Sequence, residues 1–192
     1  MKTSLLLKST LALALATPLL ASAESQLVVG PGTATARLDV RVIIPRVLFL
    51  AVGTGSAGTV DNATIDTLTF DYTGNPGDVG SGTASAGQAV NVRVRGNNGQ
   101  VVLTAATTGA LTNATADTIP WSQITSTSNL PALPSPALPL TGTGAGSNVT
   151  LNAGKITDRT AVWTFAYANS AVVAPGTYGT TNGRVTYTAT MP

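Results

Sequence analysis

The sequence contains neither histidine nor cysteine. Histidine is the commonest proton shuttle near neutral pH and cysteine is the best thiol nucleophile, so a Ser/His/Asp triad and every thiol mechanism are excluded. The lack of cysteine also excludes disulfide bonds and thiolate metal sites. The spacing of the aspartates between residues 61 and 78 matches no calcium loop. We therefore expect no enzyme activity, no catalytic residue, no cofactor and no bound metal.

Charge is scarce as well, at 9% of residues. Two of the ten basic residues, Lys2 and Lys8, belong to a segment that we expect to be removed, which leaves eight basic and eight acidic residues. A neutral chain offers no basic patch for nucleic acid or for an anionic membrane surface. Its surface is instead rich in Thr, Ser, Asn and Gly, which suits an extracellular scaffold.

The first 23 residues have the pattern of a secretory signal peptide. Lys2 and Lys8 give a positive start, and residues 11–20 form an apolar run that is too short to span a bilayer. A small-x-small motif then ends at Ala23, so we expect cleavage between Ala23 and Glu24. The processed protein should be secreted and should keep no stable membrane span.

Beyond this segment, apolar and polar residues alternate with the period of two that is typical of strands, and no convincing helix pattern is present. The clearest alternating run covers residues 33–44. Its apolar positions are Ala34, Ala36, Leu38, Val40, Val42 and Ile44. Pro45 cannot donate to a sheet and should end this run, and residues 47–52 then predict a fully buried strand.

Further strands are predicted at intervals along the chain, over residues 65–72, 89–95, 100–106, 118–124, 148–152, 160–167 and 183–191. The Gly-Asn-Asn-Gly turn at residues 96–99 favours an antiparallel hairpin between its two neighbours. Many short strands without a βαβ rhythm predict an all-β, immunoglobulin-like antiparallel sandwich. A closed barrel is the alternative architecture.

Two features have a structural and a functional interpretation. The proline-rich residues 130–140 read as an extended crossing between sheets, with a polyproline ligand as the alternative. The aromatic residues around Trp121 and Trp163 read as core, with a carbohydrate-stacking platform as the alternative.

The alternating run of residues 33–44 also has two interpretations. It is the first strand of its own domain, or it is a strand lent to a neighbouring molecule by β-strand addition. We divide the chain accordingly into a signal peptide (residues 1–23), an amino-terminal extension and candidate donor strand (24–46) and a β-sandwich domain (47–192).

Three stretches resemble the pilins of the chaperone-usher type and the related spore-coat-U-like secreted proteins. These are the alternating run before Pro45, the turn Ala-Pro-Gly-Thr-Tyr at residues 174–178, and the closing strand at residues 183–190. The turn followed by a Val/Thr/Tyr strand is the most specific of the three. The resemblance covers the two ends of the processed chain and not its middle.

The resemblance implies an incomplete sandwich that is completed by a donor strand. Leu38, Val40 and Val42 would enter the neighbouring subunit, and Val185, Tyr187 and Ala189 would lie in the last strand of the acceptor groove. The partners would be copies of the chain or related subunits, together with a periplasmic chaperone and an outer-membrane usher. The resulting fimbrium-like fibre would serve adhesion at the cell surface. A monomeric secreted binding module for carbohydrate is the alternative function.

Overall fold

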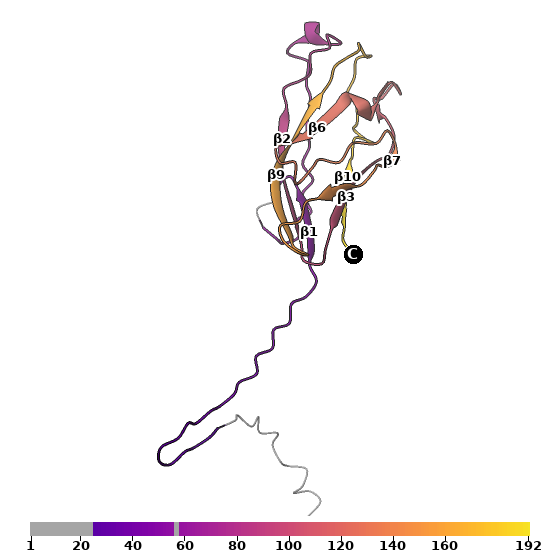
Figure 1. The fold of residues 1–192 in the computed structure, drawn as a ribbon. Coiled ribbons are helices and arrows are strands. Elements are labelled where there is room, and N and C mark those ends of the chain that lie inside the picture. Colours follow the sequence, from indigo (N-terminus) through magenta and orange to yellow (C-terminus); the bar gives the residue numbers. More distant parts are fainter. Residues whose placement is uncertain (1–24, 56–57) are drawn as a thin grey trace, which may run out of the picture. The chain divides into compact units, whose positions relative to one another are not determined.

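The computed structural model describes residues 25–55 and 58–192. The expected cleavage site between Ala23 and Glu24 lies outside these residues. The chain divides between Ile44 and Pro45 into two units, and the second unit holds all the strands of the described residues (Figure 1).

In the first unit, residues 25–44 form no strand and their side chains are exposed. Gln26 Oε1 accepts hydrogen bonds from the backbone N–H of Thr35 (3.1 Å) and from its hydroxyl (3.3 Å), which ties the two ends of a bend together. The prediction of a strand over residues 33–44 is therefore wrong for the single chain. A strand exists through its ladder of hydrogen bonds, and within residues 25–55 and 58–192 no strand pairs with this segment.

The second unit is all-β and antiparallel, as the sequence predicts. Its first sheet has four strands in the order β1-β2-β9-β6. They are β1 (Leu48–Val52), β2 (Gln88–Gly96), β9 (Thr157–Tyr167) and β6 (Ile124–Ser128). The longest of them, β9, has eleven residues and pairs with strands on both of its sides.

A second sheet faces the first (Figure 1). Its path is β10 (Thr186–Thr190), β3 (Val101–Thr107) and β7 (Gly142–Thr143), and β8 (Ser147–Val149) also pairs with β3. A small ribbon joins β4 (Leu111–Thr112) to β5 (Thr118–Ile119). The helical content of the described residues is two 3-10 turns, η1 (Pro76–Asp78) and η2 (Trp121–Gln123). Two separate sheets make a sandwich and not a closed barrel.

The core fills the space between the two sheets. Alternate residues of β2, β3 and β9 point inward, because successive side chains of a strand lie on opposite faces. The buried residues of the core are Val90, Val92, Val94, Val101, Leu103, Leu133, Val149, Ala161, Trp163 and Phe165. Trp163 is fully buried, and its indole N–H donates to Leu133 O (3.2 Å).

The predicted hairpin of β2 and β3 is not formed. β2 pairs with β1 and β9, whereas β3 pairs with β10, β7 and β8 in the other sheet. The Gly-Asn-Asn-Gly turn therefore arches from one sheet to the other, and Val94 and Val101 on its two sides both enter the core. The alternating pattern predicts which residues of a strand point inward. It does not show whether the next strand of the chain pairs with that strand or lies in the other sheet, across the core.

Other predicted strands are shorter than expected or absent. Residues 65–72 form no strand, although Leu68 and Phe70 pack on the core. The predicted strand at 118–124 is interrupted by η2, and the predicted strand at 47–52 is only half-buried as β1. An edge strand is covered from one side only, so an apolar run does not ensure full burial there.

The proline-rich crossing belongs to the core of the sandwich. Leu133 is fully buried, and its carbonyl accepts hydrogen bonds from Trp163 Nε1 and from Ser128 Oγ (2.8 Å). The N–H of Thr150 donates to Ala132 O (2.8 Å), which ties the crossing to the chain that follows β8. This packing supports the interpretation of residues 130–140 as a sheet-to-sheet crossing.

Two leucines of this crossing provide a matched pair of variants. We expect Leu133→Ala to lower the free energy of unfolding by about 2–5 kcal/mol, because it opens a cavity beside Trp163. Leu140→Ala, at a position that is 63% exposed, should change it by less than about 0.5 kcal/mol. Urea denaturation followed by tryptophan fluorescence measures both values. Equal effects of the two substitutions would contradict the packing described here.

Candidate interface at the open sheet edges

β1 is the edge strand of the first sheet. It pairs with β2, and within residues 25–55 and 58–192 no strand pairs with its other edge. Leu50 and Val52 lie opposite Val94 and Val92. The two β2 valines are fully buried, whereas Leu50 and Val52 are only partly buried. The core is therefore covered less completely at β1 than one strand further in.

β10 is the edge strand of the second sheet. It pairs with β3, and in the part of the chain that the structure describes its outer edge also has no strand beside it. Tyr187 and Ala189 lie opposite Ala105 and Leu103. These β3 residues are fully buried, but Tyr187 and Ala189 are only partly covered. The pattern found at β1 is thus repeated at β10.

The two edges lie on the same side of the sandwich. Met191 Sδ and Leu48 Cδ1 both approach Gly96, where a built β-carbon would lie 3.0 Å from the sulfur and 3.6 Å from the methyl carbon. The guanidinium Nη2 of Arg46 donates to Met191 O (3.0 Å) at the same end. β1 therefore begins where β10 ends. We call the face bounded by these two strands the open side.

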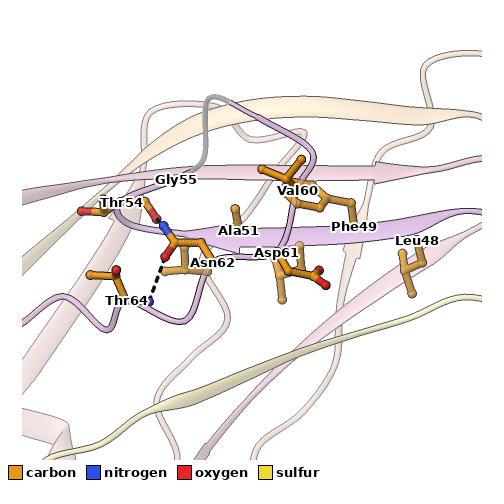
Figure 2. Close-up of a pocket in the computed structure, with 11 residues that line it drawn as sticks. Leu48, Phe49, Ala51, Thr54, Gly55, Val60, Asp61, Asn62 and Thr64 are labelled. Atoms are coloured by element: carbon orange, nitrogen blue, oxygen red, sulfur yellow. Dashed lines mark hydrogen bonds between the residues drawn. The ribbon is translucent and has the colours of Figure 1, made fainter.

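A hollow of about 470 Å³ runs along β1 (Figure 2). Side chains from both faces of β1 line it, but none from β2 does, so the hollow follows the edge of β1 that faces away from β2. Its opposite wall is the returning loop, with Val60, Asp61, Asn62 and Thr64. The hollow thus has an apolar strand edge on one side and a mainly polar wall on the other.

Side-chain hydrogen bonds hold this wall in place. Asn62 Nδ2 donates to Thr54 O (3.1 Å), and Asn62 Oδ1 accepts from Thr64 N–H (2.9 Å). Asp66 accepts from the Thr54 N–H (2.6 Å) and hydroxyl (2.7 Å). Gly53 has a φ of +90°, and a β-carbon there would lie 2.2 Å from Asp66 Oδ2, so this contact requires glycine.

Tyr187 is the aromatic residue of the open side. Its ring lies 5.2 Å from the ring of Trp163 at an interplanar angle of 57°. Its hydroxyl oxygen is buried and, among the described residues, has no hydrogen-bond partner. Removal from water disfavours the charged phenolate, so burial raises the pKa of Tyr187 well above its ordinary value of about 10.

The structure separates the predicted site residues into two groups. The apolar face of residues 34–44 is exposed, with Leu38 at 86%, Val40 at 80% and Val42 at 75%. Tyr187 and Ala189 point inward from β10, and Val185 lies one residue before that strand and is half-buried. Sequence reasoning missed the contribution of β1, because its apolar run was interpreted as fully buried.

The aromatic residues do not form a surface platform. Trp121 and Trp163 are 4% and 0% exposed, and the indole N–H of Trp121 donates to Gly109 O (2.7 Å). Phe165 and Tyr167 are buried as well. A sugar ring cannot stack on aromatic faces that the core already covers, so these residues do not support a carbohydrate site.

The acidic side chains do not gather into a metal site. Within residues 25–55 and 58–192, no three acidic residues lie close enough together to hold an ion. Asp71 accepts a hydrogen bond from Thr73 N–H (2.8 Å), which lowers the pKa of its carboxyl group. In the same described residues, no helix is long and apolar enough to cross a membrane.

Comparison with known proteins gives little direct guidance. No protein-family model matches the sequence, and a search of curated proteins finds no relative. Among solved structures, a chain from a chaperone-usher pilus is similar, with a TM-score of 0.40 and 14% sequence identity. The match covers 87% of this chain and all of that one. The interpretation of the open side depends on its own geometry.

Tyr187→Phe should make the protein less sensitive to alkali. Folding raises the pKa of Tyr187, so above about pH 10 the unfolded chain loses the phenol proton while the folded chain keeps it. The free energy of unfolding is therefore unaffected by this group below about pH 10 and falls as the pH rises further. Tyr187→Phe has no phenol proton to lose, so its stability should not fall in this way at high pH. At pH 7 the variant should be as stable as the wild type or more stable by up to about 1 kcal/mol, because the buried hydroxyl that it lacks has no hydrogen-bond partner. Urea denaturation at about pH 8 and pH 11 measures both effects. An identical pH dependence in the two proteins would contradict the assignment.

Proposed function

We propose that this protein is a structural subunit that joins copies of itself by exchanging a β-strand. Residues 34–44 of one copy add as a strand on the open side of the next, along the outer edge of β1 or β10. One observation carries the proposal: the sandwich has two open edges on one side, and the same chain carries an exposed alternating segment.

The open side lacks what an additional strand supplies. Backbone N–H and C=O groups at the outer edges of β1 and β10 have no ladder partner in the described residues. Leu50, Val52, Tyr187, Ala189 and Met191 pack on the core but remain partly exposed. One inserted strand would hydrogen-bond to an edge and cover these side chains together.

Residues 34–44 have the properties of such a strand. Their apolar positions recur every second residue, so all six would face the core of the acceptor at once. Fully burying a side chain such as Leu38 or Val40 contributes about 1.5–3 kcal/mol. The segment has eleven residues, the same number as β9, which is the longest strand of the acceptor sandwich.

Opposite charges lie on the segment and on the wall of the hollow beside β1. The polar face of the segment carries Arg37, Asp39 and Arg41, a net positive charge, and the wall of the hollow beside β1 carries Asp61. An arginine that approaches this wall would meet a carboxylate at the rim, where water still reaches both groups. Such a pair adds little affinity, but it favours one register of the strand over its neighbours.

This function requires no catalytic residue, cofactor or metal. A head-to-tail contact between different surfaces does not close on itself, so repeated exchange builds an open fibre at the cell surface. An open edge is also an aggregation hazard before assembly. A periplasmic chaperone that covers the edge during export, and an outer-membrane usher that orders the exchange, would meet this need.

The apolar face of the segment is where the proposal is tested. The full chain without its signal peptide should form multimers that resist SDS, and Leu38→Asp with Val40→Asp should leave it monomeric, because two carboxylates cannot enter the core. Thr33→Asp with Thr35→Asp adds the same charge to the polar face and should still assemble. Size-exclusion chromatography with light scattering distinguishes these outcomes.

A synthetic peptide of residues 33–45 provides a second readout. Added to the Leu38→Asp, Val40→Asp variant, it should bind in a 1:1 ratio and raise the melting temperature, because it fills the open side in trans. A wild-type protein that stays monomeric, together with a peptide that does not bind, would refute the proposed function.

A further inference from the structure

The chain that leads into β1 is held by one side chain of the arch between β2 and β3. Asn97 Nδ2 donates to Pro45 O (2.8 Å), and Asn97 Oδ1 accepts from Val47 N–H (2.8 Å). The backbone N–H of Asn97 also donates to Val47 O (3.3 Å). One asparagine thus makes three hydrogen bonds to residues 45–47, and we call this arrangement the junction clamp.

The junction clamp extends the line of β1 backwards beyond its first residue. Leu48 lies opposite Gly96, and Val47 follows opposite Asn97, which is the next position of the same antiparallel register. The amide of Asn97 bonds to the backbone much as another strand would. Residues 45–47 are therefore fixed along the arch and do not form a turn.

The residues just before the clamp also resist a turn. Pro45 restricts Ile44 to extended conformations, because the proline ring clashes with a helical backbone at the preceding residue. Val42, Ile43 and Ile44 are all β-branched, and the tight turns of hairpins require positive φ angles that such residues avoid. A tight two-residue hairpin turn directly before β1 is therefore disfavoured.

The corner beside the junction is closed as well. Arg46 donates from Nη2 to Met191 O (3.0 Å) and to Pro192 O, and Asn98 Nδ2 also donates to Pro192 O. These bonds join the start of β1 to the end of β10. A segment that folded back at this corner would have to break them before it reached the open side.

Such folding back would otherwise be the favoured reaction. A segment joined to its own acceptor by a short linker has an effective concentration in the millimolar range, whereas separate subunits meet at their actual, far lower concentration. A hairpin with β1 would also run antiparallel to β1 and hence parallel to β10, because β1 begins where β10 ends. A strand from another copy has no such restriction and can pair antiparallel with β10.

We infer that the junction clamp prevents residues 34–44 from occupying the open side of their own chain and thereby reserves them for a second copy. Pro45, Arg46 and Asn97 act as positioning residues, since none of them belongs to the exchanged strand or to the edges that receive it. This inference rests on the proposed function.

The test replaces the clamp by a turn. Pro45→Asn with Arg46→Gly places Asn-Gly, the preferred two-residue hairpin turn, at the junction, and Asn97→Ala removes the bonds that oppose it. We expect this triple variant to be monomeric, to lose multimers by on the order of tenfold or more at micromolar protein, and to protect residues 34–44 from hydrogen exchange.

Two matched proteins complete the test. Asn97→Ala alone perturbs the fold least and should lower multimer yield in the same direction. The triple variant that also carries Leu38→Asp and Val40→Asp should be monomeric without protection, which shows that protection arises from insertion.

The outcomes separate the two proposals. Wild-type multimers, together with a folded triple variant or an Asn97→Ala variant that assembles equally well, would overturn the role of the clamp and leave strand exchange intact. A wild-type protein that neither assembles nor binds the peptide of residues 33–45 would overturn both.

Discussion

The pairing of backbone hydrogen-bonding groups is the constraint on which the rest of this structure depends. A sandwich must end its sheets somewhere, and each last strand leaves a row of N–H and C=O groups to be covered. Here one end strand of each sheet, β1 and β10, lies on the same side, so the edges that have no strand partner among the described residues coincide with the thin part of the core. The alternating segment of residues 34–44 has an apolar side chain at every second position, which is the pattern of a strand with one face on a core.

On the opposite side of the sandwich, a segment of the same chain covers the sheet edge. Beyond β6, the proline-rich crossing places Leu133 in the core and bonds its carbonyl to Ser128 Oγ and Trp163 Nε1. Proline suits this position because an extended crossing needs no ladder donor. One side is thus covered by the chain itself, whereas on the other the described residues place no strand beside β1 or β10.

Much of the fold could be predicted because inward-facing positions follow from alternation. β2, β3, β9 and β10 lie close to where the sequence predicts them, and their alternating apolar residues face the core. The pairing of strands could not be predicted in the same way: residues 96–99 have the composition of a hairpin turn but arch between sheets. Of the candidate site, the β10 residues were predicted, whereas β1 and Asn97 were missed.

The sequence by itself determined the all-β class, the inward positions of the main strands and the alternation of residues 33–44, because side-chain chemistry and a period of two encode them. The tertiary structure decided which strands became edges, that both edges share one side, and that Asn97 holds the chain at Pro45 and Val47. The physical reason is that these features are contacts between residues 40 or more positions apart. No local pattern records which distant backbone group will meet a given side chain.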